Sequence, residues 1–346
     1  MLSPRQAAAL PYIRAWLFAI AFLTFCMVIV GGATRLTDSG LSITEWQPLI
    51  GVIPPLTAEA WQEAFEKYRL TLEYNTVNHG MTLAQFQFIY WWEWSHRFLG
   101  RFIGVAFLVP LVFFASTGRI SRGLRHRLLA IFVLGALQGT LGWYMVASGL
   151  ADRVDVSQYR LSAHLSLATL IYGATVWTAL GLGVMRHAPS SDRERAGLLI
   201  VALVLLQIAG GGFVAGLDAG MGYNTWPLMD GKLVPGGLFV MEPFWRNFFE
   251  NAMTVQFNHR FLAYVIAVLV ASYAYVVRTP ASVMLLVILA IQIAFGIGVL
   301  LYQVPLWLGL LHQAGAIVLL TAALWNLHSL LRISPGHAVQ SRGTGS

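Results

Sequence analysis

Eight long apolar runs separated by polar connections make up most of the chain. They lie approximately at positions 14–34, 86–115, 128–149, 161–185, 197–217, 253–277, 281–302 and 307–331. Each run matches the roughly 20 residues of helix that cross the hydrocarbon core of a bilayer. Because the runs are continuous, and do not alternate between apolar and polar residues as barrel strands do, they indicate helices. The pattern therefore predicts an all-α integral membrane protein with eight transmembrane helices.

The composition supports this class and narrows the chemistry. Of the 346 residues, 57% are hydrophobic and only 11% are charged, against about 25% charged residues in an average soluble domain. The chain has one cysteine, Cys26, so it can form neither an intramolecular disulfide nor a cysteine-based metal cluster. The N-terminus lacks a short apolar segment with a small-residue cleavage site, so the first run is expected to be retained as a helix.

Lysine and arginine are distributed unevenly between the two sides. Of the 22 such residues, 12 fall on the connections that share a side with the two termini, and 7 fall on the much longer loops of the other side. Cytoplasmic loops of membrane proteins carry the excess of positive charge. We therefore expect a multi-pass protein of the cell (inner) membrane with both termini in the cytoplasm. The net charge of +7 is explained by this topology and gives no reason to expect a nucleic-acid partner.

The two halves of the chain repeat each other. The outer loops after the first and fifth runs read GGATRLTDSGLSITEWQPLIGVIPP (31–55) and GGFVAGLDAGMGYNTWPLMDGKLVP (211–235). Their matching positions include Gly31, Gly32, Asp38, Gly40 and Trp46, which recur 180 positions later, and Pro48 and Leu49, which return as Pro227 and Leu228. The second and sixth runs share HRFLGR and HRFLAY, and the third and seventh share QGTLG (138–142) and QIAFG (292–296). The sequence predicts two tandem, pseudo-symmetric four-helix bundles, 14–185 and 197–331, related by an axis along the membrane normal.

Four histidines lie inside apolar runs, near the outer ends of these runs. They are His96, His164, His259 and His312, on the second, fourth, sixth and eighth runs. The other five are expected on the surface: His79, His126, His187, His328 and His337. An ionisable residue inside a membrane is costly unless it has a partner, so the first four are candidates for function, and we expect them to share one depth.

Pairs of these histidines can hold a haem. Imidazole is the commonest neutral metal ligand, and two imidazoles on facing helices can hold a haem iron from both sides. The pairs would be His96 with His164, and His259 with His312. Interhelical hydrogen bonds are the simpler alternative. Small residues nearby would let a flat macrocycle approach the backbone, although such residues also pack ordinary membrane helices: Gly100, Gly104, Ser162, Ala163, Gly309 and Gly315.

Three arginines lie beside the histidines. Arg97 and Arg101 can pair with haem propionates in the first half, and Arg260 can do so in the second half. The alternative is that each of them extends to the lipid head groups.

One carboxylate distinguishes the two halves. Glu93 is the only acid in any apolar run, and its equivalent 163 positions later is Gln256. Glu93 and His96 are three residues apart and therefore share a helix face. A carboxylate in a low-dielectric pocket suits acid–base catalysis or the stabilisation of positive charge, and the alternative is a surface ion pair with Arg97. We interpret the first half as a reaction site and the second half as an electron-handling site.

The motif combination resembles one known family. EWSHR in the second run, NHR in the sixth run and the loops GLSITEWQPLIGVIPP and GYNTWPLMDG resemble haem A synthase, over about residues 16–331. The resemblance implies an enzyme that oxidises the C8 methyl group of haem O to a formyl group, giving haem A for cytochrome oxidase. Two hydroxylations followed by loss of water, with oxygen taken from water, would form the aldehyde. Haem O synthase and cytochrome oxidase assembly factors are the protein partners it suggests, and a homo-oligomer stays open.

The resemblance also assigns residues. Haem O would bind as substrate between His96 and His164. A low-spin haem b would bind as cofactor between His259 and His312. Glu93 matches the essential acid of the family.

The first outer loop departs from part of the family. Some members have a cysteine pair there, and this chain has none, so it resembles the branch without that pair. Within the loop, LTAEAWQEAFEKYRL (56–70) has apolar residues at helical spacing. This segment would lie along the membrane surface as a lid, or else form a solvated connector.

Two other functions use the same features. A di-haem transmembrane electron-transfer cytochrome b would need the four histidines but no acid, so Glu93 opposite Gln256 favours the enzyme. A transporter is also consistent with parallel repeats. However, the ionisable groups lie near one face, and no pair of interrupted helices is evident at mid-depth.

Overall fold

The computed structural model describes residues 2–45, 50–152 and 154–332. The repeated Trp46, Pro48 and Leu49, and His337 of the tail, lie outside these residues.

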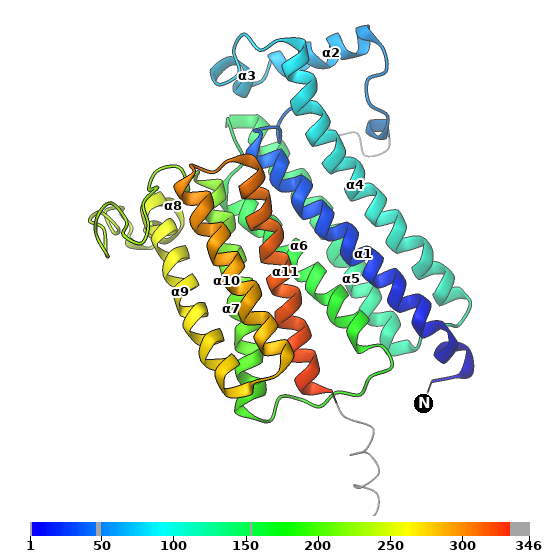
Figure 1. Cartoon of the computed structure of the whole chain (residues 1–346). Coiled ribbons are helices and arrows are strands. Elements are labelled where there is room, and N and C mark those ends of the chain that lie inside the picture. The colour runs from blue at the N-terminus through cyan, green and yellow to red at the C-terminus, as the bar shows by residue number, and fades with distance from the viewer. Residues whose placement is uncertain (1, 46–49, 153, 333–346) are drawn as a thin grey trace, which may run out of the picture.

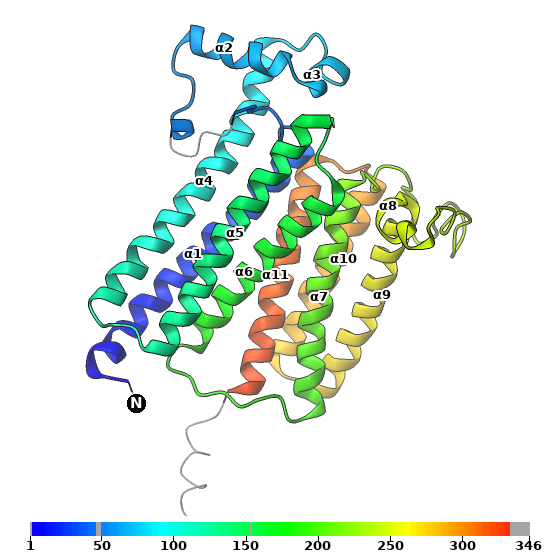
Figure 2. The ribbon, with the colours of Figure 1, turned by 180° about the vertical axis from the view of Figure 1, so that it is seen from behind.

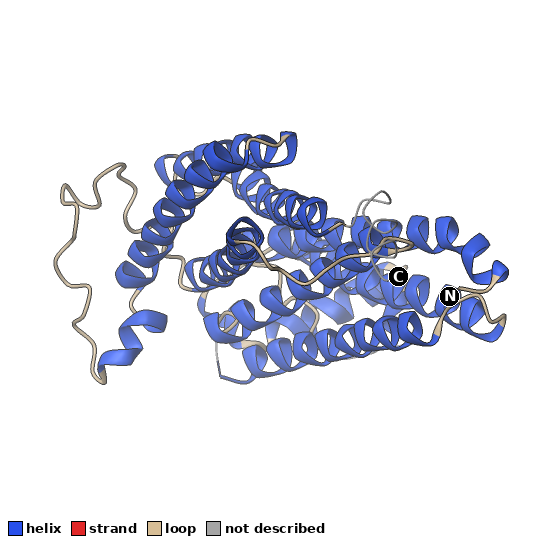
Figure 3. Ribbon diagram, turned by 90° about the horizontal axis from the view of Figure 1, so that it is seen from below, coloured by secondary structure: helices blue, strands red, loops and turns tan. Residues whose placement is uncertain are grey.

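Eight helices in the described part of the chain are long and apolar enough to cross a membrane. They are α1 (Pro4–Leu36), α4 (Leu83–Ser116), α5 (Arg122–Asp152), α6 (Gln158–Gly181), α7 (Asp192–Gly216), α9 (Ala252–Val277), α10 (Pro280–Leu301) and α11 (Leu306–Leu331). They run alongside one another in Figure 1, and the view from below shows helices joined by loops (Figure 3). The prediction of an all-α membrane protein with eight spans is confirmed.

Several helix ends differ from the hydropathy pattern, and those of α1 and α6 show why. α1 begins at Pro4, well before the predicted start, because the Ser3 side chain and Gln6 form a reciprocal cap. α6 ends at Gly181, before the predicted end at 185. There the chain turns at Gly183, with φ +71. Arg186 folds back over the Trp177 ring at 4.0 Å and donates a 2.9 Å hydrogen bond to its carbonyl. Local polar contacts thus set both ends, and average hydropathy does not report them.

Each set of four successive spans packs as a group. α1 packs against α4 and α6, and α5 packs against the same two helices. The second four repeat this pattern, with α7 and α10 each packing against α9 and α11. The two groups meet along α1, α6, α7 and α11, as seen from both sides in Figure 1 and Figure 2. The symmetry axis between the groups stays a prediction.

Glycines on α7 bring the two groups into close contact. A Cβ added at Gly212 would lie 2.7 Å from Cα of Ser162, and one at Gly216 would lie 2.5 Å from Cα of Gln158. The Ser162 hydroxyl also donates a 2.8 Å hydrogen bond to the Ala209 carbonyl. Ser162, expected beside a macrocycle, therefore serves the packing of α6 on α7, a common use of small residues in membranes.

Arg35 joins the outer ends of the two groups. Arg35, at the end of α1, donates to Asp38 at 2.9 Å in its own loop. It also donates to Asp218 at 2.8 Å and to the Ala215 carbonyl at 3.0 Å in the other half. Asp38 and Asp218 are equivalent in the repeat, and both have φ 48. The position equivalent to Arg35 is Ala215, so this contact is made from one half only.

The first outer loop contains η1 (Ile50–Val52) and two helices, α2 (Ala58–Arg69) and α3 (Leu72–Thr76). Phe65 and Tyr68 of α2 lie 5.1 and 5.3 Å from the Phe86 ring of α4, and Trp61 lies 4.9 Å from Tyr90. The predicted helix in 56–70 is thus present and docks on the outer end of α4 (Figure 1). Its action as a lid stays a prediction. The second outer loop carries η2 (Phe244–Arg246) and α8 (Asn247–Glu250).

Glu73 of α3 is buried within this loop, with 4% of its surface exposed. Burial raises the pKa of its carboxyl to about 8. The negative charges of Glu93 and Asp38 act in the same direction, and a hydrogen bond from the Tyr68 hydroxyl opposes them. The docked loop therefore favours a protonated Glu73.

Docking of this loop should weaken as the pH rises. When undocked, Glu73 ionises near its ordinary pKa of 4.5, whereas the docked carboxyl keeps its proton up to about pH 8. The docked state is therefore fully stabilised below pH 4.5, and it loses this stabilisation as the pH rises from 4.5 to about 8. Hydrogen-exchange protection of segment 57–82, corrected for intrinsic exchange, should fall over this range.

The Glu73→Gln variant should lose this pH dependence. Glu66→Gln, at an exposed position of α2, is the matched control and should keep it. A pH profile that is the same in Glu73→Gln and the wild type would refute the role of Glu73.

Candidate functional site

The first histidine pair is brought together by α4 and α6. The rings of His96 and His164 have centroids 6.4 Å apart and planes inclined at 58°. Two imidazoles that bind one metal from opposite sides through bonds of about 2 Å have centroids about 6 Å apart. The observed separation fits that arrangement.

The second pair lies on α9 and α11. His259 and His312 are close enough for their imidazoles to interact electrostatically. The buried Nδ1 atoms of His164 and His259 have no hydrogen-bond partner among the described residues. Within the same residues, no group of three or more His, Cys, Asp or Glu side chains is placed to hold a metal ion. The histidines are therefore available as pairs, and each pair has a ring nitrogen open to a further partner.

The four histidines lie at comparable places in their helices. His164, His259 and His312 are within about two turns of the outer starts of α6, α9 and α11. His96 is further along α4, whose first turns extend beyond the other helices beneath α2 and α3 (Figure 1). A common depth in the membrane stays a prediction.

Each imidazole faces a glycine of a neighbouring helix. An added Cβ would lie within 2.8 to 3.4 Å of the ring in every case: Gly31 at His96, Gly142 at His164, Gly211 at His259 and Gly296 at His312. These glycines are equivalent in the repeat, 31 with 211 and 142 with 296. They let each imidazole lie directly against the backbone of the neighbouring helix, where a side chain would collide with the ring.

Other small residues were expected to let a macrocycle approach the backbone, and three of them face other side chains. Gly100 faces Met27, Gly309 faces Leu36, and Gly315 faces the Gln292 side chain. The glycines that do face the imidazoles recur in the repeated GG, QGTLG and QIAFG motifs, and this recurrence could have indicated them.

Three glutamines fix the helices that carry histidines. The side-chain amides of Gln138, Gln207 and Gln292 donate hydrogen bonds of 2.9 to 3.0 Å to the backbone carbonyls of His164, His259 and His312, respectively. Gln138 and Gln292 recur in the QGTLG and QIAFG motifs, which could have indicated them. Gln207 has no such signal, because its equivalent in the first half is Met27.

Glu93 is buried at the outer end of the first site, with 2% of its surface exposed. Its Oε2 accepts hydrogen bonds from the Ser42 hydroxyl at 2.8 Å and from the Ile43 backbone N–H at 2.7 Å. Its Oε1 pairs with Arg97, which also donates to the Ile43 carbonyl at 2.9 Å and the Glu45 carbonyl at 3.1 Å. The ion pair considered from the sequence is thus present, but it lies inside the protein and holds the outer loop.

The second half contains the same framework with an amide. Gln256, with 3% of its surface exposed, donates to the Ala219 carbonyl at 2.7 Å and accepts from Arg260 at 3.0 Å. Arg260 also donates to the Tyr223 carbonyl at 2.7 Å and the Thr225 carbonyl at 2.8 Å. Positions 223 and 225 follow 43 and 45 by 180 residues. Both arginines thus bind equivalent loop carbonyls, and the acid and the amide take equivalent places.

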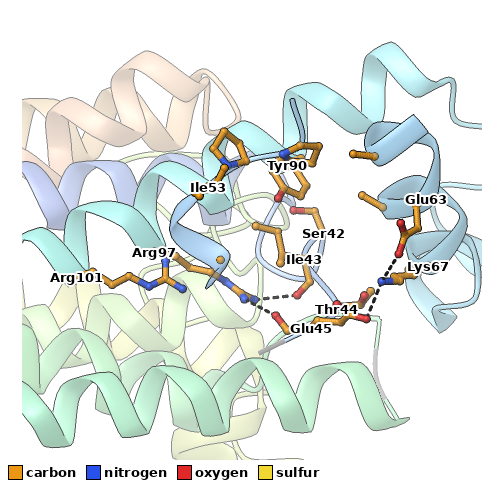
Figure 4. Close-up of a pocket in the computed structure, with 15 residues that line it drawn as sticks. Ser42, Ile43, Thr44, Glu45, Ile53, Glu63, Lys67, Tyr90, Arg97 and Arg101 are labelled. Atoms are coloured by element: carbon orange, nitrogen blue, oxygen red, sulfur yellow. Dashed lines mark hydrogen bonds and ion pairs between the residues drawn. The ribbon is translucent and has the colours of Figure 1, made fainter. Parts of the chain in front are cut away.

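A polar pocket of about 230 Å³ lies between the first outer loop, α2 and α4 (Figure 4). Arg97 and Arg101 of α4 line it together with Glu45, and Lys67 of α2 pairs with Glu45 and Glu63 at 2.9 Å. The volume is below the roughly 300 Å³ at which typical ligand pockets begin. The pocket can therefore take a charged edge of a large ligand and not a whole macrocycle.

The histidines expected on the surface differ among themselves. His79 and His126 are exposed, and His187 is half-buried, 3.6 Å from Glu194. The expectation for His328 is wrong, because it is buried with 9% exposure and its ring lies 6.1 Å from that of Trp177. The inner ends of α11 and α6 pack together there, which the position of His328 near a helix end did not indicate.

Comparison with known proteins identifies one family. Residues 14–324 match the model of the COX15-CtaA family, described as cytochrome oxidase assembly protein. A heme A synthase of Parvibaculum lavamentivorans is 52% identical over 322 residues, which cover 92% of this chain and 94% of that protein. Heme A synthases of Nitrosospira multiformis and Mesorhizobium japonicum are 51% and 50% identical, over 92% and 90% of this chain and 94% and 89% of theirs. The chain therefore belongs to the COX15-CtaA family of cytochrome oxidase assembly proteins.

Proposed function

We propose that this protein is a haem A synthase, which oxidises a methyl group of haem O to a formyl group and so makes haem A for cytochrome oxidase. His96 and His164 hold the substrate in the first half. His259 and His312 hold a haem b in the second half. The family membership and the names of the relatives support the reaction, and the 6.4 Å separation of the His96 and His164 rings and the open ring nitrogens support the placement of two haems.

The difference between Glu93 and Gln256 is the observation that carries the proposal. Both side chains occupy the same framework, bonded to an arginine and to the backbone of the outer loop. Gln256 holds its loop by donating to the Ala219 carbonyl, whereas Glu93 holds its loop by accepting from the Ser42 hydroxyl and the Ile43 N–H. The ability of the carboxylate to carry charge and accept a proton is the property that the second half lacks.

The residues around the first site have separable roles. Bound haem O supplies the methyl carbon, and bound haem b supplies a centre that takes up electrons. Glu93, on the His96 face of α4, accepts a proton from the water that provides oxygen and stabilises positive charge nearby. Ser42, the Ile43 N–H and Arg97 hold its two oxygens in place.

Arg97, Arg101 and Arg260 can make two kinds of contact, with loop carbonyls and with haem propionates. Arg97 and Arg260 hold loop carbonyls, and their guanidinium groups would also attract haem propionates. Arg101 lines the polar pocket, where a propionate edge fits. We assign Arg101 as the principal propionate contact of the substrate, with Arg97 beside it and Arg260 in the equivalent place in the second half.

The proposal extends to topology and partners. The two packed groups of helices, within 14–185 and 197–331, are the repeat halves, with both termini cytoplasmic and the haem sites toward the outer side of the membrane. Haem O must arrive from the enzyme that makes it, and haem A must pass on to the oxidase, so contacts with those proteins are expected.

Glu93→Gln tests the proposed reaction. The variant keeps an amide oxygen that can accept from Arg97, as Gln256 does from Arg260, and the reduced-haem b spectrum should stay unchanged. Haem A formation should fall by roughly 100-fold or more, because the group that moves protons is removed. Chromatography of extracted haems measures haem O and haem A directly.

Gln256→Glu is the matched control for Glu93→Gln. It places the same chemical change in the second half and should leave haem A formation within a few-fold of wild type. Unchanged haem A formation in Glu93→Gln would favour a di-haem electron-transfer cytochrome instead.

Alanine replacements of the four histidines test which half holds which haem. His259→Ala and His312→Ala should lose haem b, whereas His96→Ala and His164→Ala should keep haem b and lose bound haem O. Extraction and chromatography of the haems from each purified variant gives the result. Equal loss of haem b from all four variants would contradict the assignment.

Cysteine labelling tests the orientation. In a Cys26→Ser background, a Lys232→Cys variant should react with a membrane-impermeant maleimide in intact cells from which the outer membrane barrier has been removed. An Asp192→Cys variant should react only after lysis, because its loop is cytoplasmic. The reverse pattern would invert the proposed topology.

A further inference from the structure

The backbones of three histidines are held by side-chain amides. Gln138 of α5, Gln207 of α7 and Gln292 of α10 each donate to the carbonyl of the histidine on the next helix. Gln207 and Gln292 also reach the imidazoles themselves, at 3.2 Å. Polar groups that hold a metal ligand from behind fix its orientation, and their loss typically weakens metal binding by about 10- to 100-fold.

The fourth equivalent position holds a methionine. Gln207 corresponds, 180 positions earlier, to Met27 of α1. The Met27 Cε lies 3.3 Å from the site of a Cβ at Gly100, which follows His96 by about one turn of α4. In the second half, Ala263 stands where Gly100 stands in the first. The methionine side chain thus reaches the place that the Gln207 amide occupies beside His259, and the glycine makes room for it.

A thioether cannot do what the amide does. Methionine sulfur is a weak hydrogen-bond acceptor and has no N–H to donate, so Met27 cannot hold the His96 carbonyl or ring. Methionine is also flexible and adapts to a moving neighbour. The two ligand helices of the second half are therefore both fixed by amides, whereas in the first half only the helix of His164 is fixed in this way.

We propose that Met27 makes His96 the exchangeable ligand of the protein, so that the first half releases its haem while the second half retains its own. The inference rests on the proposed function, in which haem O must enter the first site and haem A must leave it at every turnover. Haem b has no such need. The replacement of one amide by a thioether thus separates a substrate site from a cofactor site built on the same plan.

Haem transfer to a scavenger tests Met27 independently of activity. Purified protein carrying both haems is mixed with excess apomyoglobin, and the haems that remain bound are extracted at intervals and separated by chromatography. Wild-type protein should lose haem O faster than haem b. Met27→Gln should slow the loss of haem O by roughly 10-fold and leave the loss of haem b unchanged.

Two further variants make the result specific. Met27→Leu keeps an apolar side chain and should release haem O at the wild-type rate, with an unchanged haem spectrum. Gln207→Met should accelerate the loss of haem b and leave haem O unaffected. Because slower release is a gain of retention, it is not produced by a damaged fold.

The outcomes separate this inference from the proposed function. Equal haem O release from Met27→Gln, Met27→Leu and wild type would overturn the inference, as would a Met27→Gln protein that no longer retains haem O. A changed spectrum in Met27→Leu would also overturn it, because the sulfur itself would then be a ligand. If His164→Ala retained haem O as well as wild type, the proposed assignment of the substrate site would fail, whatever the behaviour of Met27.

Discussion

Two partly buried arginines hold the outer loops of this protein onto its transmembrane helices. Arg97 and Arg260 donate to backbone carbonyls of equivalent loop residues, and each is joined one helical turn earlier by a side chain that accepts from it. Inside a membrane protein, loop carbonyls and guanidinium groups both require partners, and here they satisfy each other. The glycines near the helix ends that lead into those loops lie against the imidazoles of His96 and His259.

The two halves differ at the side chain that accepts from each arginine, which is Glu93 in the first half and Gln256 in the second. An amide at 256 and a carboxylate at 93 fill the same space and accept from the same kind of arginine. A duplicated fold can therefore change its chemistry at this place without changing its architecture. Met27 and Gln207 are a second such place, where the change affects how firmly a histidine is held rather than which protons can move.

The hydropathy pattern was sufficient for the eight helices and their order, and the motif combination was sufficient for the family, as the comparisons confirm. The placement of histidines on alternate helices also indicated which rings would be neighbours, and those of His96 and His164 lie 6.4 Å apart. Helix ends were harder to predict from the sequence, because the cap at Ser3 and the turn at Gly183 depend on single residues that an average over a window conceals. Contacts between helices were the hardest feature to predict from the sequence. Which face of α10 would present Gly296 to His312, or which end of α11 would bury His328, depends on helix rotation, and an apolar run surrounded by lipid and protein alike carries little information about rotation.

Arg35 shows what joining two copies in one chain permits. Its guanidinium donates to the carbonyl of Ala215, which is the residue equivalent to Arg35 in the second half. It also donates to Asp218, in the loop of the second half. In a dimer of identical single halves, every copy would carry the arginine, and two like charges would meet at the axis. Fusion into one polypeptide removes this conflict, since one copy keeps the arginine while the other keeps alanine. A displacement of either loop must then strain the same ionic contact, so the two outer loops are mechanically connected.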